Sequence, residues 1–172
     1  MKPIFISAGH SNQDPGAVAN GTTEAAVVLE FRDLVADHLH ALDVYFERDG
    51  TQGQNLPLRE AVKRIPSNGV AVEFHLNAAS ANTATGVETL SSDKNKDFCR
   101  GLCELISLRL GIRNRGAKDE GSGQHSRLAF VQAGGVIVEL FFLTNEQDLR
   151  KYQVQKNELA REVAEYLKKA AQ

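Results

Sequence analysis

The sequence is poor in the residues that mark disulfide-rich or membrane-spanning proteins. Its 172 residues include two cysteines, one methionine, four prolines and no tryptophan. Cys99 and Cys103 are four residues apart in a helical pattern, where a disulfide has poor geometry, and two sulfurs without a nearby histidine are a weak metal signal. No stretch approaches the length of a membrane span, and the N-terminus lacks the apolar core of a signal peptide. We therefore expect reduced cysteines, no membrane insertion and synthesis in the cytoplasm without a signal peptide.

An excess of either charge is also missing. The 20 Lys and Arg residues against 22 Asp and Glu residues give a formal net charge of −2 and a pI near 6.2. The basic residues are scattered along the chain, so no electrostatic footprint for DNA, RNA or anionic lipid is present. We expect no nucleic-acid partner.

The apolar content, by contrast, is sufficient for one sizeable core. Hydrophobic residues make up 42% of the chain, which is ordinary for a globular fold, and the length fits about one domain. No internal repeat or Pro-rich linker divides the sequence. Residues 1–172 are expected to form one domain, and we expect a monomer.

Short β-branched segments alternate with helical patterns along the chain, which favours an α/β layer fold. Near-continuous apolar strands at both ends of the chain favour a largely parallel sheet. We predict a single-domain, largely parallel (mixed) sheet of about six strands flanked by helices. The strands are expected at residues 3–8, 43–47, 69–75, 86–90, 128–131 and 135–142, and the helices at 24–42, 57–65, 93–110 and 156–170. Two long segments rich in small residues, 76–86 and 112–127, are predicted as loops with a functional role.

Three predicted strands end in a titratable residue. IFISAGH closes on His10, GVAVEFH closes on His75, and GVIVE reaches Glu139, while Glu24 opens the first predicted helix. In a parallel sheet the carboxyl ends of the strands share one edge, and a βα connection returns the helix start to that edge. We expect these four groups to converge there.

Two imidazoles and one carboxylate form a standard catalytic zinc shell, with the fourth position left for a water whose pKa falls to about 7. A second carboxylate beside that water is what a hydrolase needs for proton transfer. His10, Glu24 and His75 are therefore the candidate ligands of a Zn²⁺ ion at the carboxyl edge of the strands, and Glu139 is the candidate general base and acid.

Each of these residues also has an ordinary structural interpretation. A histidine at a strand end is commonly a hydrogen-bonded turn residue, and Glu24 suits the first turn of a helix because of the helix dipole. Asp14, in the same loop as His10, could replace Glu24 as the third ligand, although Asp before Pro-Gly is also a turn former. Glu139 is harder to explain structurally, since an acid inside a buried strand needs a partner.

Several blocks of the sequence resemble, in order, those of the zinc-dependent N-acetylmuramoyl-L-alanine amidases of cell-wall autolysins and phage lysins. They are ISAGHSNQDPGAVANGTTE, VEFHLNA, GVETL, RGAK and VIVELFFLTN. The resemblance implies His10, Glu24 and His75 as zinc ligands and Glu139 as the catalytic acid/base. It also implies the substrate, which is the amide joining the lactyl group of N-acetylmuramic acid to L-alanine in peptidoglycan.

Autolysins of this family usually add an export signal and a wall-binding module. This chain shows neither, so we expect residues 1–172 to be a single catalytic domain of the phage or prophage lysin type, acting on the cell wall after release. Two alternatives stay open. A zinc peptidase acting on stem peptides could use the same ligand shell, and a non-catalytic wall-binding domain could keep the fold.

Each of the other polar residues has more than one interpretation. Alternation puts Glu73 on the same side of its strand as His75, where it could orient that ligand or pair with a basic side chain. Asn77 is expected to fix the loop after His75 or to contact substrate. Arg115, Lys118 and Arg127 could bind the carboxylates of the stem peptide or lie on a solvated turn. The remaining histidines, His38, His40 and His125, are expected at the surface.

Overall fold

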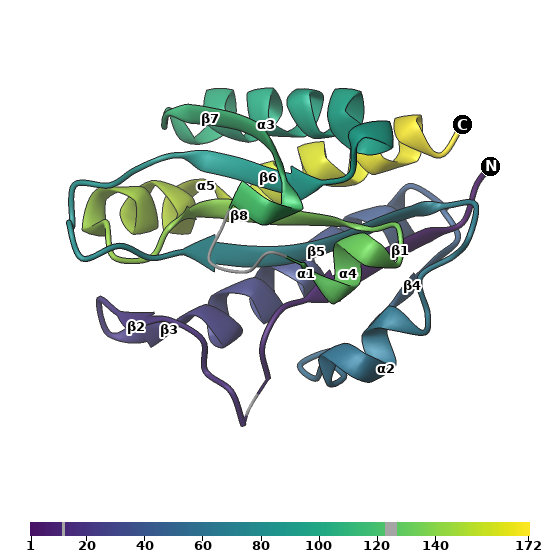
Figure 1. The fold of residues 1–172 in the computed structure, drawn as a ribbon, viewed down its shortest axis with the longest axis horizontal. Helices are drawn as coiled ribbons and strands as arrows, with labels where there is room; N and C mark the ends of the chain where they lie inside the picture. The colour runs from purple at the N-terminus through teal and green to yellow at the C-terminus, as the bar shows by residue number, and fades with distance from the viewer. Residues whose placement is uncertain (12, 123–126) are drawn as a thin grey trace.

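The computed structural model describes residues 1–11, 13–122 and 127–172. Its centre is a six-stranded sheet in the order β4-β1-β5-β8-β6-β7 (Figure 1). β4, β1, β5 and β8 run parallel, β6 is antiparallel to β8, and β7 is parallel to β6. The strands are β1 (Ile4–Ala8), β4 (Phe46–Arg48), β5 (Val70–Asn77), β6 (Val87–Ser91), β7 (Asn114–Asp119) and β8 (Val136–Phe142), and a small separate hairpin joins β2 (Val18–Ala19) to β3 (Thr22–Thr23).

Three long helices cover one face of the sheet, and two short helices partly cover the other (Figure 1). The long helices are α1 (Glu24–Ala41), α3 (Lys96–Leu110) and α5 (Glu146–Ala170), and the short ones are α2 (Leu58–Val62) and α4 (Ala129–Gln132). Two short 3₁₀ turns lie at Asp93–Asn95 and Glu120–Ser122. Among the described helices, none is both long enough and apolar enough to cross a membrane.

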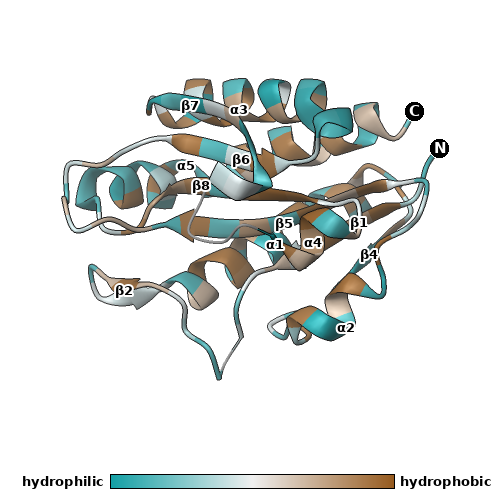
Figure 2. Cartoon of the chain, in the orientation of Figure 1, coloured by the Kyte–Doolittle hydropathy of each residue, from teal (hydrophilic) through white to brown (hydrophobic). Residues whose placement is uncertain are grey.

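Alternation along the strands decides which side chains enter the main core. On β5, Val72, Phe74 and Leu76 pack against the long helices, whereas Glu73 and His75 point to the other face. In Figure 2 the central strands are largely brown, while the helices alternate between brown and teal. Because α2 and α4 are short, the second face has only a small apolar cluster, and polar side chains have room there.

Local signals set the helix boundaries. The Thr23 hydroxyl accepts a hydrogen bond from the Ala26 amide at the start of α1, and Asn145 caps α5 in the same way through Gln147 and Asp148. Gly111 ends α3 with a φ of 61°, a left-handed conformation that suits glycine.

The predicted architecture is confirmed, although several predicted boundaries are wrong. Residues 128–131 were expected to form a strand but belong mainly to α4. Phe130 and Val131 are adjacent and both buried in one cluster, which a helical turn permits and a strand does not.

The predicted loop 112–127 is also wrong in part, because it contains β7. This edge strand is NRGAKD, whose polar composition hides the strand signal, and charged residues are a usual feature of sheet edges. Helix α5 begins at Glu146 instead of 156, because the Asn145 cap lies upstream of the clear apolar pattern. β4 begins at Phe46 instead of 43, and α2 is shorter than the predicted 57–65.

Both cysteines are buried and free, as expected.

Candidate metal centre and active site

His10 follows the end of β1 in a conformation that few residues other than glycine adopt. Its φ is 63°, in the left-handed region. The Asn55 side-chain amide donates to the carbonyl of Ala8 at 3.0 Å and to that of His10 at 2.6 Å. These two bonds hold the end of β1 and so aim the imidazole of His10.

A buried ion-pair network supports the loop that carries Asn55. Arg32 of α1 has no exposed surface, pairs with Asp33 and Asp49, and donates to the carbonyls of Asp49, Thr51 and Gln54. Asp49 in turn accepts a bond from the Ala8 amide at 3.1 Å. This network has no local signal in the sequence, because its members are separated along the chain.

Glu24, the first residue of α1, lies between the two imidazoles. Its Oε1 atom is 3.0 Å from Nε2 of His10, 3.0 Å from Nδ1 of His75 and 2.9 Å from the Leu76 amide, which donates to it. Oε2 accepts from the Ala17 amide at 3.1 Å. Burial opposes ionisation of Glu24, but the hydrogen bonds from His10 and His75 outweigh it and hold the pKa well below its usual range.

His75, near the end of β5, is flanked by two carboxylates. Its Nδ1 faces Glu24, and its Nε2 lies 3.1 Å from Oε1 of Glu73. Burial lowers the pKa of His75, but hydrogen bonds to Glu24 and Glu73 raise it well above the ordinary value. The hydrogen bond to Glu24 likewise raises the pKa of His10.

Together these residues form a donor set that fits a zinc ion. Within the described residues, His10, Glu24 and His75 each offer one ligand atom, and all three atoms lie within 4.8 Å of one another. Atoms bound to a tetrahedral zinc at about 2.0–2.1 Å lie roughly 3.4 Å apart, close to the 3.0 Å separations between Glu24 and the two rings. Asp14 instead meets the outer nitrogen of His10, with Oδ2 at 3.0 Å from Nδ1, so it lies outside this donor set.

Glu139 lies on the same face of the sheet, one strand away from His75. It is directly opposite His75 on β5 and opposite Glu88 on β6, in the middle of β8 and not at its end as the sequence analysis assumed. Its Oε2 atom is buried and has no hydrogen-bond partner among the described residues. Burial, assisted by the charges of Glu24 and Glu88, raises the pKa of Glu139 to about 7. The carboxyl group can therefore gain or lose a proton near neutral pH.

Three of the four predicted substrate-binding residues converge on Glu88, which the sequence analysis did not single out. Asn77 donates to its Oε1 at 3.0 Å, Lys118 approaches its Oε2 at 2.7 Å, and Arg115 pairs with the same oxygen. Arg115 and Lys118 come from β7. A signal was available in GVETL, because an acid inside an apolar strand needs a partner.

Other predicted residues lie away from this cluster. Arg127 is exposed and bonds to the Gln132 side chain at 2.8 Å. His40 is exposed and His38 meets Asn157, both at the end of α1. His125 lies outside the described residues.

A cavity of about 270 Å³ opens beside the two imidazoles. His10, Glu73 and His75 form its polar side, and Leu56–Leu58 at the start of α2 form its apolar side. The cavity thus gives access to both imidazoles.

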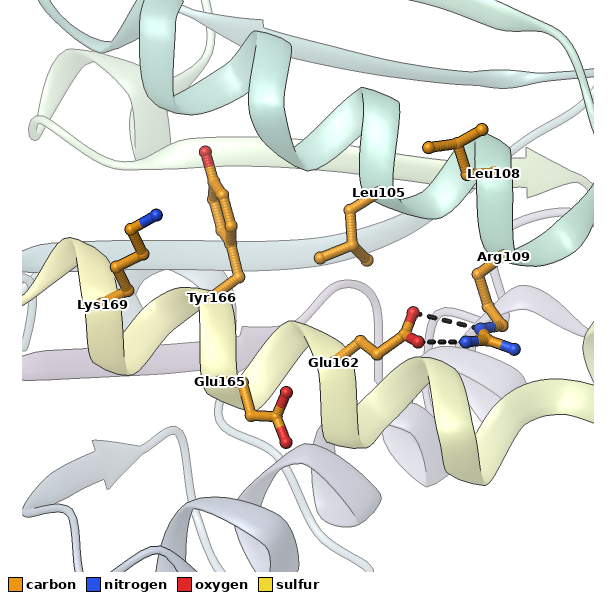
Figure 3. Close-up of a pocket in the computed structure, with 7 residues that line it drawn as sticks. All are labelled: Leu105, Leu108, Arg109, Glu162, Glu165, Tyr166 and Lys169. Carbon is orange, nitrogen blue, oxygen red and sulfur yellow. Dashed lines mark hydrogen bonds and ion pairs between the residues drawn. The ribbon is translucent and has the colours of Figure 1, made fainter.

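A larger groove of about 560 Å³ lies between α3 and α5, on the helix-covered side of the sheet (Figure 3). Figure 3 shows the ion pair between Arg109 and Glu162 together with five other lining residues. Nε of Arg109 lies 3.1 Å from Oε2 of Glu162. None of the seven is a histidine or a cysteine, and the Glu162 carboxylate is paired with Arg109, so the groove lacks the imidazole and thiolate donors typical of a zinc site.

A family model described as N-acetylmuramoyl-L-alanine amidase matches residues 4–169. The chain belongs to this family. A crystal structure of a candidate N-acetylmuramoyl-L-alanine amidase from Neisseria meningitidis is 41% identical in sequence and superposes with a TM-score of 0.89, covering 99% of this chain and 97% of that one.

Two curated relatives are longer than this chain. The N-acetylmuramoyl-L-alanine amidase LytC of Bacillus subtilis is 27% identical over 155 residues, which are 86% of this chain and 31% of LytC. The endolysin of Bacillus phage SPP1 is 27% identical over 157 residues, which are 86% of this chain and 57% of the endolysin. The chain thus spans about a third of one relative and over half of the other.

Proposed function

We propose that this protein is a zinc-dependent N-acetylmuramoyl-L-alanine amidase, which hydrolyses the amide between the lactyl group of N-acetylmuramic acid and L-alanine in peptidoglycan. Family membership supports the reaction and the substrate. The observation that carries the proposal is the convergence of His10, Glu24 and His75, with Glu139 on the adjacent strand.

The donor set supports zinc. Two imidazole nitrogens and a carboxylate oxygen are typical of catalytic zinc sites that keep one position open. Nε2 of His10, Nδ1 of His75 and Oε1 of Glu24 would hold the ion, since these atoms face one another. When bound, zinc supplies a Lewis acid for the scissile carbonyl and an acidified water.

Glu139 would move the proton. As a carboxylate it accepts a proton from the attacking water, and as a carboxylic acid it returns that proton to the leaving amine of L-alanine. Its pKa of about 7 in the metal-free protein suits both steps, and its Oε2 atom, which has no partner in the described part of the chain, can face a ligand.

The cluster around Glu88 would attract the stem peptide. Arg115 and Lys118 supply two positive charges, whereas Glu88 supplies one negative charge. The side chains of Arg115 and Lys118 are about 30% exposed. The excess positive charge favours the carboxylates of the stem peptide, and Asn77 would steady Glu88 beside them. Arg127, which lies apart from the cluster, would contact a more distant part of the substrate.

We further propose that residues 1–172 act as one catalytic domain of the phage-lysin type. The match to the SPP1 endolysin supports this type, and the match to LytC of Bacillus subtilis supports the amidase reaction.

The test combines metal removal with product analysis on purified peptidoglycan. Chelation should abolish release of stem peptides and added zinc should restore it. Glu139→Gln should retain zinc while turnover falls by about 10²–10⁴-fold, the usual contribution of a general acid/base. Glu162→Gln, a Glu-to-Gln change at the Arg109 ion pair on the opposite side of the sheet, serves as the control with normal turnover.

Mass spectrometry of the products decides the bond that is cut. Intact stem peptides with a free N-terminal L-alanine support an amidase. Release of single amino acids would support a peptidase instead, and zinc binding without any product would indicate a wall-binding domain.

A further inference from the structure

Glu73 is a buried acid on β5 that the proposed catalytic steps do not use. Its exposed fraction is 3%, and it lies on the same face of the strand as His75. Both carboxylate oxygens are occupied: Oε1 lies 3.1 Å from Nε2 of His75, and Oε2 accepts a hydrogen bond from the Ser7 hydroxyl at 3.0 Å. Ser7 belongs to the neighbouring strand β1, so the carboxylate is held from both sides.

The two ring nitrogens of His75 contact different carboxylates. Nδ1 faces Glu24, where the other two candidate ligand atoms converge, and Nε2 faces Glu73. Nδ1 lies among the candidate ligand atoms of His10 and Glu24, so it is the nitrogen placed to bind a metal ion. Nε2 lies outside that set and is placed to donate a hydrogen bond to Glu73.

Packing restricts the ring in the same orientation. A Cβ atom placed on Gly9 would come within 2.2–2.6 Å of three atoms of the His75 ring, so the ring lies directly against the backbone of Gly9. The ring is therefore bounded by the Gly9 backbone on one side and tied to Glu73 through its edge.

We propose that Glu73, anchored by Ser7, is a positioning residue that fixes the tautomer and orientation of His75 so that Nδ1 binds the metal. This inference rests on the proposed zinc site. A carboxylate bonded to the outer nitrogen also makes a histidine ligand more basic and tightens metal binding.

The first experiment measures zinc affinity by competition with a chromophoric chelator. Glu73→Gln keeps the size and a weak acceptor but removes the charge, and it should weaken zinc binding by about 10–100-fold, the usual effect of losing such a partner. Ser7→Ala should weaken it less, because it only loosens the anchor. Asp148→Asn is the control. Asp148 is also a buried acid, but its side chain contacts Thr85 and Gly86 and none of the candidate metal ligands, so zinc affinity should not change.

The second experiment observes the ring itself. The chain has five histidines, so a ¹⁵N-histidine NMR spectrum of the zinc-loaded protein is simple to assign. Wild type should show His75 with a protected Nε2–H and a metal-bound Nδ1, and Glu73→Ala should lose that protection. A merely structural role for Glu73 would change stability without changing this signature.

The outcomes separate the two proposals. Wild type that binds no zinc would remove the proposed function and this inference with it. Wild type that binds zinc while Glu73→Gln binds it equally, or a His75 ligated through Nε2, would overturn only the inference. If Glu73→Gln does not fold, the wild-type spectrum and Ser7→Ala still decide the question.

Discussion

The two histidines of the candidate metal centre are supported in opposite ways. Each ring presents one nitrogen to Oε1 of Glu24 at 3.0 Å and the other to a second carboxylate. The second carboxylate of His10 is Asp14, whose side chain is 67% exposed, and that of His75 is Glu73, whose side chain is 4% exposed. We call these the exposed arm (His10, Asp14) and the buried arm (His75, Glu73).

The difference shows where the rigidity of each arm originates. An exposed ion pair contributes little, about 0–1 kcal/mol, because water and salt screen it. The exposed arm is held instead by its backbone, through Asn55 and the buried Arg32 network behind it. The buried arm lies within β5 and is held by its side chains, because Glu73 has little contact with water.

The largest effect is expected from a change that breaks both arms at once. Glu24→Gln removes the charge shared by the two rings. Zinc affinity should fall by more than about 100-fold, which exceeds the loss expected when a residue that only supports a ligand is changed. Chelator competition measures the loss. Glu30→Gln, at an exposed position of the same helix, is the matched control. A Glu24→Gln protein that binds zinc as tightly as wild type would show that the two arms do not share a metal.

Glu139, opposite the buried arm, should make stability depend on pH in the metal-free protein. Its folded pKa of about 7 lies above the ordinary 4.5, so between these values the native state keeps a proton that the unfolded chain has lost. This stabilising contribution is roughly 3 kcal/mol. It is complete below about pH 4.5 and is lost as the pH rises through about 7.

Urea unfolding at pH 5 and pH 8, with a chelator present, measures that contribution. The free energy of unfolding of wild type relative to Glu139→Gln should decrease between the two pH values. A constant difference would mean that Glu139 is ionised throughout and that its site is wetter than the structure indicates.

Asn55→Ala should damage the exposed arm through its backbone. Two carbonyl groups lose their donor, and one such loss costs about 1–3 kcal/mol when the group stays buried. We expect a free energy of unfolding lower by about 1–3 kcal/mol, together with weaker zinc binding. Asn157→Ala, which removes an exposed contact to His38, is the control and should change neither.

The smallest effect is expected from Asp14→Asn. Asparagine keeps one oxygen for the Gly16 amide, so the charge and the acceptor beside Nδ1 of His10 are lost. Zinc affinity should fall by less than about 10-fold, and the difference should shrink further at high salt because the pair is exposed. A loss equal to that of Glu73→Gln would refute the distinction between the two arms.

The sequence predicted the helices and the central strands because their apolar periodicity is local. The same pattern singled out His10, His75 and Glu139 as polar interruptions at or near strand ends, and the structure places both histidines at Glu24 and Glu139 opposite His75. β7 and α4 were mistaken because their signals are weak: one is a polar edge strand, and the other is a four-residue helix whose apolar residues suit either structure.

The partners of these residues could not be predicted in the same way. Asn77, Arg115 and Lys118 were candidates for the site, but their common partner Glu88 became evident only when β7 was seen beside β6. Arg32 and Asn55 contact residues far from them in sequence, and no local sequence motif indicates these contacts.

The sequence by itself determined the fold class, the set of titratable residues available for metal chemistry, and membership of the amidase family. Each of these depends on residue identity and short-range spacing. Only the tertiary structure decided which nitrogen of each imidazole faces Glu24, that Glu73 is buried and Asp14 exposed, and that one oxygen of Glu139 has no partner within residues 1–11, 13–122 and 127–172. Hydrogen-bond direction and burial depend on strand register and on packing between distant segments, which no short stretch of sequence contains.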